Sequence, residues 1–315
     1  MSPIITRDPV LITGGAGFIG ANLVNKLLDL GYKNINLLIR NSTDLKRLKN
    51  VLPKIRLHEV DLLDKDELKT IVEKINPSII IHLATYSAYR DHTAALEMIE
   101  VNIKGTMNLL ISSKDINYKI FINTGSSSEY GIKENPMKED DILEPISFYA
   151  ATKASATLLC QVFSKEHQKP IVTLRPFSVF GPHEEEKRFI PIIIKAAIQR
   201  HPIKLTSGTQ RRDFVYIKDV VDIYIKTISK GKELSGQILN MGTGLEFTND
   251  EVVEKLFKVT GKKVKIEKGV FPKRLWDTSH WVADISKTKK YLDWEPKYSL
   301  EEGLKETYQW FKKYL

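Results

Sequence analysis

The chain has 315 residues, 42% of them hydrophobic, and its 48 Lys and Arg residues against 39 Asp and Glu give a net charge of +9. This is enough apolar material for a substantial core, but no run approaches the ~20 apolar residues of a membrane span and the start lacks the order of a secretory signal. The single cysteine, Cys160, excludes an internal disulfide and a thiolate metal cluster. We therefore expect a cytoplasmic protein and predict no metal site.

The positive charge is spread along the chain, without a run of four basic residues or a basic stripe interleaved with aromatic residues. Proteins that bind single-stranded nucleic acids carry such a stripe. We interpret the excess charge as a solvated surface, and expect neither a nucleic acid nor a membrane as a partner.

Strands and helices alternate through the first half of the chain. Val10–Thr13 is a short apolar run that leads into glycines, and the helical apolar spacing that follows ends at Gly31. Further strands are predicted at 34–39, 55–62 and 78–85, with a helix over KDELKTIVEKI between the last two.

The alternation continues with a helix at 101–115, a strand at 119–126, a helix at 149–167 and a strand at 170–177. This order predicts an α/β fold with a doubly wound parallel Rossmann sheet covered on both faces. The pattern then changes, and the segments after Gly236 are short, mixed and rich in turns. We expect a Rossmann domain over 1–177 plus about 213–240, and a smaller C-terminal lobe over 178–212 plus about 241–315.

The segment TGGAGFIG places Gly14, Gly17 and Gly20 three residues apart, between the first strand and the first helix. Glycines in this position permit a tight turn, a close approach of the backbone to a pyrophosphate and close helix packing, while the helix N-terminus favours negative charge. In this context the triplet indicates a dinucleotide site, and the alternative is a merely structural glycine turn.

Arg40 lies at the end of the second strand, where an acidic residue would bind the adenosine ribose of NAD. A guanidinium followed by the hydroxyls of Ser42 and Thr43 offers a fork to a 2′-phosphate instead. We therefore favour NADP(H) over NAD(H), against the alternative of an arginine that points into solvent. Asp61, after the third strand, is a candidate acceptor for the adenine amino group.

Tyr149 and Lys153 lie four residues apart in YAATK, so a helix carries both on one face. A free phenol has a pKa near ~10, so phenolate formation at pH 7 costs roughly 4 kcal/mol. An ammonium ~4 Å away contributes about the same amount at an effective dielectric of ~20. The pair therefore predicts a tyrosine base, and Ser126 in NTGSSSEYG, at the end of a strand, is a candidate to share a proton with a substrate oxygen.

These motifs together resemble the extended short-chain dehydrogenase/reductases, in particular the NAD(P)-dependent nucleotide-sugar epimerase/dehydratase group. The resemblance covers essentially the whole length. The matching segments are GGAGFIG, DLLD, HLAT, NIKGTMNLL, SSSEYG, YAATK, LRPFSVFGP, RRDFVYIKDVV, NMGTG and LDWEPKYSLEEGL.

The resemblance implies that Tyr149 is the base, that Lys153 holds the nicotinamide ribose and that Ser126 completes the site. It makes the C-terminal lobe the nucleotide-sugar-binding part and implies a homodimer formed through helices at about 102–115 and 149–166. The predicted cofactor contacts are Gly14, Gly17, Phe18, Ile19, Gly20, Arg40, Ser42, Asp61, Leu62, Leu83, Ala84, Thr124, Tyr149 and Lys153. The predicted substrate contacts are Ser126, Ser127, Ser178, Arg212, Arg274 and Asp277.

Departures from the family pattern narrow the reaction. Ser127 and Ser128 stand where the 4,6-dehydratases carry Asp-Glu, and Ser128 stands where the decarboxylases carry Glu. Glu129 is adjacent, but on an extended segment it would point to the other face. We therefore disfavour both reactions. Ser178 replaces the asparagine of many sugar epimerases and weakens the simplest epimerase assignment.

Epimerases of this group return the hydride to the same sugar and retain NAD, whereas a net reductase consumes a cofactor that exchanges, commonly NADPH. Because of Arg40, our leading hypothesis is an oxidoreductase that reduces a nucleotide-linked 4-keto-hexose. An isomerase, a nucleotide-sugar 4-epimerase with retained NAD, is the alternative. A third is a non-catalytic NADP-binding regulator that uses the fold to report cofactor state.

Overall fold

The computed structural model describes residues 8–86, 94–270 and 278–314. The chain divides into two compact units. Unit 1 comprises residues up to Gly131, Leu143–Arg175 and Ile223–Leu239, and unit 2 comprises Ile132–Ile142, Pro176–Asp222 and Asn240 onward. Residues 132–142 and 213–222, which the sequence led us to assign to the Rossmann part, thus lie in unit 2.

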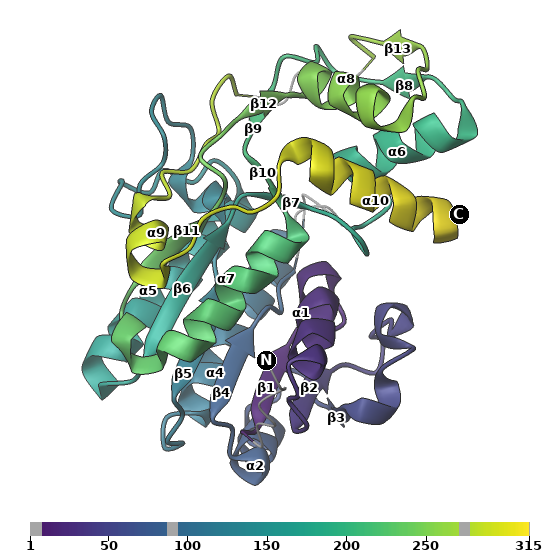
Figure 1. Ribbon diagram of the computed structural model, residues 1–315. Coiled ribbons are helices and arrows are strands. Elements are labelled where there is room, and N and C mark those ends of the chain that lie inside the picture. The colour runs from purple at the N-terminus through teal and green to yellow at the C-terminus, as the bar shows by residue number, and fades with distance from the viewer. Residues whose placement is uncertain (1–7, 87–93, 271–277, 315) are drawn as a thin grey trace. The chain divides into compact units, whose positions relative to one another are not determined.

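Unit 1 is built on a seven-stranded sheet with the order β11-β6-β5-β4-β1-β2-β3, and neighbouring strands from β3 to β6 pair in parallel (Figure 1). This doubly wound order confirms the Rossmann fold class. The strands are β1 (Val10–Thr13), β2 (Ile35–Ile39), β3 (Arg56–Glu59), β4 (Ile79–His82), β5 (Ile120–Thr124), β6 (Ile171–Pro176) and β11 (Ile238–Met241).

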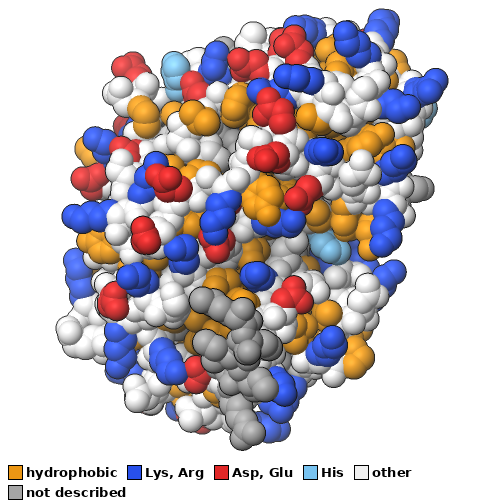
Figure 2. Space-filling view, in the orientation of Figure 1, with side chains coloured by type: hydrophobic (Ala, Val, Ile, Leu, Met, Phe, Trp, Pro, Cys, Tyr) orange, Lys and Arg blue, Asp and Glu red, His pale blue; other side chains and the backbone are white. Residues whose placement is uncertain are grey.

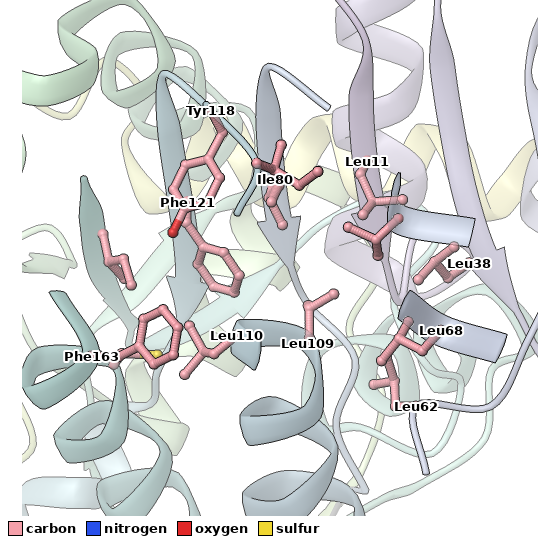
Figure 3. Close-up of a cluster of buried hydrophobic side chains, with 14 of the residues drawn as sticks. Leu11, Leu38, Leu62, Leu68, Ile80, Leu109, Leu110, Tyr118, Phe121 and Phe163 are labelled. Carbon is pink, nitrogen blue, oxygen red and sulfur yellow. The ribbon is translucent and has the colours of Figure 1, made fainter. Parts of the chain in front are cut away.

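Helices cover both faces of this sheet. Figure 1 shows α1 (Phe18–Asp29) and α7 (Ile217–Lys230) on one face and α2 (Lys65–Ile75), α4 (Gly105–Ser112) and α5 (Phe148–His167) on the other. The second face holds a core in which Leu109 and Leu110 of α4 point toward sheet side chains such as Phe121, near Phe163 of α5 (Figure 3). Apart from the edge strand β3, whose residues are mostly exposed, the predicted strands are buried because apolar side chains on both of their faces meet helices.

The predicted helix at 101–115 begins earlier than expected and is not regular. It starts with α3 (Ala95–Ile99), passes through a π-helical turn, η3 (Glu100–Lys104), and continues as α4. Asn102 lies in the π turn and is buried. A π turn inserts one extra residue and rotates the following face, which periodicity in the sequence did not reveal.

The described residues of unit 2 form helices and three two-stranded sheets. The sheets pair β7 (Ser178–Phe180) with β10 (Phe214–Tyr216), β9 (Arg211–Arg212) with β12 (Phe247–Thr248), and β8 (Ile203–Lys204) with β13 (Ile266–Glu267). The expectation of only short segments after Gly236 is wrong. Both α8 (Asn249–Thr260) and α10 (Leu300–Tyr314) are long and pack together. The unit also contains α6 (Phe189–Gln199) and α9 (Ser286–Leu292). Short 3₁₀ turns complete the chain at η1 (Lys46–Leu48), η2 (Leu52–Lys54), η4 (Ser127–Tyr130) and η5 (Gly231–Leu234).

Within the described ranges, no helix has the length and apolar character that crossing a membrane requires. On the face drawn in Figure 2, Lys and Arg side chains are interspersed with Asp and Glu side chains.

Candidate active site

The carboxyl ends of three neighbouring strands bring the predicted site segments of unit 1 together. Thr13 at the end of β1 lies beside His82 of β4, which lies beside Asn123 of β5. The glycine loop follows β1, residues 83–86 follow β4, and the serine segment follows β5. In doubly wound sheets this edge is where ligands bind.

The glycine loop is shaped by two positions at which a side chain does not fit. Gly14 has a φ of +68°, and a Cβ there would lie 2.6 Å from the backbone nitrogen of Ala84. A Cβ on Gly20 would lie 2.4 Å from the carbonyl oxygen of Gly14. The loop thus packs directly on Leu83 and Ala84, both predicted cofactor contacts.

The first turn of α1 is suited to an anion. Gly17 caps it without a side-chain hydrogen bond, and no acidic residue lies in that turn, which Phe18 and Ile19 begin. Its backbone N–H groups and helix dipole therefore favour a bound phosphate. The loop and helix together fit the pyrophosphate of a dinucleotide.

The segment after β2 forms an exposed turn. Thr43 Oγ1 accepts a hydrogen bond from the backbone nitrogen of Arg40, and the Thr43 nitrogen donates to the Arg40 carbonyl. The side chains of Arg40 and Ser42 are exposed. Asp61 is also exposed, with Oδ1 accepting from the nitrogen of Leu63, whereas Leu62 is buried.

His82, which the sequence analysis did not single out, is buried between two threonines. Its Nδ1 is hydrogen-bonded to Thr13 Oγ1 at 2.7 Å and its Nε2 to Thr106 Oγ1 at 2.9 Å. Burial, with the nearby Lys153 charge, lowers the pKa of this histidine to about 3. The imidazole is therefore neutral and ties β1 to α4.

Tyr149 and Lys153 lie one turn apart near the start of α5, which Ser147 caps. Lys153 is 5% exposed, and its Nζ donates to the Thr124 carbonyl oxygen at 2.6 Å. Tyr149 is half-buried. The Thr124 hydroxyl is hydrogen-bonded to Tyr224 at 2.7 Å. The hydrogen bond to Thr124 thus fixes the Lys153 side chain to the end of β5. The lysine itself lies on α5, one helical turn after Tyr149.

Ser126 caps η4, and its Oγ accepts a hydrogen bond from the nitrogen of Ser128 at 3.1 Å. Because the N–H takes one lone pair, the hydroxyl proton stays available for donation. Ser126 and Ser127 are both buried. Ser126 can therefore act as a hydrogen-bond donor to a ligand.

The expectation that Glu129 lies on an extended segment is wrong, because it belongs to the 3₁₀ turn η4. Its carboxylate accepts from the Ser126 nitrogen at 2.7 Å through Oε1 and from Arg175 Nε at 2.8 Å through Oε2. Glu129 and Arg175 are 0% and 1% exposed. The turn is a capping box, and the S-x-x-E spacing in the sequence is the pattern that predicts one.

Asn102 is a second residue that sequence reasoning missed. Its Oδ1 accepts from Thr85 Oγ1 and from the Tyr86 nitrogen, and its Nδ2 donates to the Tyr86 carbonyl and to Thr152 Oγ1. It thus fixes the segment after β4 to α5, next to Lys153. Its neighbours in the chain include Glu100 and Lys104, so polarity alone does not mark Asn102 in the sequence.

Unit 2 carries two of the predicted substrate contacts. Ser178 begins β7, and its nitrogen donates to the Asp213 carbonyl. The Arg212 guanidinium lies over the Trp281 ring at 5.1 Å. Arg274 and Asp277 lie outside the described residues.

This fold and site define a Rossmann-type, dinucleotide-binding enzyme with a Tyr and Lys pair on one helix. Residues 10–242 match the NAD dependent epimerase/dehydratase family. The chain belongs to this family.

Three relatives illustrate the similarity. The chain is 37% identical to the UDP-glucuronate 4-epimerase of Thermodesulfobacterium geofontis, covering 96% of this chain and 95% of that protein. It superimposes with a TM-score of 0.89 and 29% identity on the UDP-glucose 4-epimerase of Thermotoga maritima solved with UDP-glucose, covering 97% and 99% of the two chains. The UDP-glucuronic acid 4-epimerase of Bacillus cereus was solved with UDP-glucuronic acid and NAD. The chain superimposes on it with a TM-score of 0.88 and 28% identity, covering 98% of this chain and 100% of that chain.

Proposed function

We propose that this chain is a UDP-hexose 4-epimerase that retains NAD through the catalytic cycle, with UDP-glucuronate as the first substrate to test. The observation that carries the proposal is the assembly of Tyr149, Lys153 and Ser126 at the strand edge that also holds the glycine loop. The three relatives, each described as a 4-epimerase of a UDP-sugar, support it. From the sequence alone, reduction of a 4-keto-sugar was the leading hypothesis and 4-epimerisation the alternative. The proposal reverses this preference.

The pyrophosphate of the cofactor would lie against the N–H groups of α1 and the Gly14–Gly20 loop. Lys153 would hold the nicotinamide ribose. Bound NAD supplies the hydride acceptor for C4 of the sugar and then the donor that returns it. The residues of the chain supply the proton transfer and the orientation.

Tyr149 Oη takes the proton of the sugar 4-hydroxyl as C4 is oxidised. The Lys153 ammonium offsets the cost of the phenolate, by about 4 kcal/mol if the two charges lie ~4 Å apart at an effective dielectric of ~20. Ser126 donates a hydrogen bond to the same sugar oxygen, keeps its proton, and stabilises the 4-keto form. Tyr149 returns its proton once the keto sugar presents its opposite face.

We assign cofactor binding to unit 1 and the nucleotide diphosphate to unit 2. In unit 2, Arg212 offers a planar guanidinium that suits a pyrophosphate, and Ser178 offers a hydroxyl. Arg274 and Asp277 complete the proposed set by family resemblance.

A homodimer is part of the proposal. In unit 1, α3 and α5 pack together, and they expose Leu96 (75%), Phe148 (63%), Leu158 (52%) and Val162 (59%). Apolar side chains gathered on adjacent helices mark an interaction surface.

We assign the protein to a reducing compartment, the cytoplasm, because its only cysteine is buried and unpaired.

Reduction of a nucleotide 4-keto-sugar by NADPH is the second candidate, and the exposed Arg40 at the end of β2 is the observation that favours it. A guanidinium there would bind a 2′-phosphate.

Purified protein should be offered UDP-glucuronate and UDP-glucose without added cofactor, and a UDP-4-keto-hexose with NADPH. The epimerase proposal predicts conversion of a UDP-hexose to its 4-epimer without net change in nicotinamide absorbance. Stoichiometric loss of NADPH absorbance without epimer formation would support the reductase instead. Binding of NADP without turnover of any sugar nucleotide would favour the non-catalytic regulator.

A further inference from the structure

Lys153 of the proposed catalytic site belongs to a buried group of three charged side chains, all in unit 1. Lys153, Glu129 and Arg175 are 5%, 0% and 1% exposed. Glu129 is the acidic member of this group. Its carboxylate pairs with Arg175 at 2.8 Å, and its negative charge also acts on Lys153. Burial raises the pKa of Glu129, and the charges of Arg175 and Lys153 oppose that effect. Both of its oxygens accept hydrogen bonds, which is the pattern of an ionised carboxylate.

The chain makes room for this carboxylate. A Cβ on Gly125 would lie 2.6 Å from Glu129 Oε1 and 3.1 Å from Arg175 Cγ. The glycine directly before Ser126 therefore lets the acid fold back under the serine. The Arg175 guanidinium also lies over the Tyr130 ring at 4.6 Å, which fixes the pair from the other side.

We propose that Glu129 is a positioning residue for the catalytic centre: its charge keeps Lys153 protonated, and its Oε1 holds the backbone of Ser126. This inference rests on the proposed function, because it assigns Glu129 a role in the Tyr149 proton transfer. Glu129 itself lies beneath the reacting groups and acts through its two neighbours.

The electrostatic surroundings of Lys153 support this role. Burial lowers the pKa of Lys153, and the Glu129 charge opposes that effect. Two further titratable groups that interact with the Lys153 charge are neutral: His82 on β4, whose pKa falls to about 3, and Cys160 on α5, whose pKa rises to about 12. Among the described groups that act on Lys153, Glu129 thus supplies the negative charge.

The two partners of the ion pair allow a matched comparison. Glu129→Gln and Arg175→Gln break the same bond, but they remove charges of opposite sign. A purely structural role predicts that both variants change the enzyme in the same way. A counter-charge role predicts opposite effects on Lys153, because one variant removes its anion and the other removes a competing cation.

The first measurement needs no substrate. Lysine ¹³Cε resonances are titrated in the full-length protein, with the Lys153 signal assigned by its loss in Lys153→Met. We expect the Lys153 midpoint to fall by at least about one pH unit in Glu129→Gln, and to stay or rise in Arg175→Gln. Glu129→Asp, which withdraws the charge by one methylene, should lower it by less and serves if Glu129→Gln does not fold.

The second measurement is the pH dependence of kcat on UDP-glucuronate or UDP-glucose. The alkaline limb should move to lower pH in Glu129→Gln, with little change in KM, and should not do so in Arg175→Gln. An unmoved Lys153 midpoint in Glu129→Gln, or equal shifts in both glutamine variants, would overturn the inference. If the wild-type protein turns over no UDP-hexose, the proposed function fails while the lysine titration still decides the role of Glu129.

Discussion

Replacing Gly20 by alanine tests the dinucleotide site at its tightest point. The added Cβ would lie 2.4 Å from the Gly14 carbonyl oxygen and 2.7 Å from Gly15 Cα, whereas ordinary contacts begin near 3.4 Å. Both neighbours are backbone atoms, so the loop must move by about 1 Å to accept the methyl group. Such overpacking costs ~1–3 kcal/mol, offset by about 1 kcal/mol from the better helix propensity of alanine.

Stability should therefore fall by only ~0–2 kcal/mol, whereas cofactor binding should suffer more. Loss of one N–H contact to a charged phosphate costs about 1.5–3 kcal/mol, which corresponds to roughly 10- to 150-fold weaker binding. Isothermal titration with NAD measures this change. Lys26→Ala, at an exposed position in the last turn of the same helix, is the control and should bind NAD as the wild type does. Wild-type affinity in Gly20→Ala would refute the assignment of this loop to the pyrophosphate.

Two further predictions concern the stability of unit 2. Asp213 accepts hydrogen bonds from the nitrogen and hydroxyl of Thr243 and from the Gly244 nitrogen. Asp213→Asn turns one of these acceptor atoms into a donor that faces N–H groups, so it should lower the free energy of unfolding in urea by ~2–4 kcal/mol. An unchanged urea midpoint would contradict this prediction. Burial raises the pKa of Glu184 from 4.5 to about 8. The stability that this group contributes is full below about pH 4.5 and is lost as the pH rises through about 8. Between pH 5 and pH 8 the wild type should therefore lose up to about 4 kcal/mol relative to Glu184→Gln, and parallel curves for the two proteins would show that the carboxyl is not held neutral.

Much of unit 1 could be predicted because its signals are local. The strand at Val10–Thr13 and the helix over Lys65–Ile75 agree with the pattern of apolar residues, since strand and helix periods differ clearly. The glycine spacing and the four-residue spacing of Tyr149 and Lys153 also depend only on neighbours in the chain.

The remaining features depend on partners distant in sequence. Glu129 and Arg175 are 46 residues apart. No local sequence pattern predicts that the buried arginine of β6 pairs with this carboxylate. The wrong assignment of Glu129 to an extended segment followed from treating the serines as a continuation of β5, although the S-x-x-E spacing predicts a turn. The π turn at Asn102 was hidden for a similar reason, because its side chain bonds to Tyr86 and Thr152 across the fold.

The long helices of unit 2 were missed because they are amphipathic rather than apolar. In α10, buried Leu304, Tyr308 and Phe311 recur at helical spacing among charged residues. That pattern is typical of a helix with one face in the core, but the many lysines and glutamates obscured it.

The proposed reaction is tested most directly by the fate of the hydrogen on C4. UDP-glucuronate carrying deuterium at C4 is incubated with the protein and an excess of unlabelled NADH, and the 4-epimer is analysed by mass spectrometry and NMR. We expect the product to keep its deuterium at C4, because the same hydride returns to the sugar from a cofactor that never leaves. Release of the label into the free cofactor, or the absence of any epimer from this and every other UDP-hexose, would contradict the proposal.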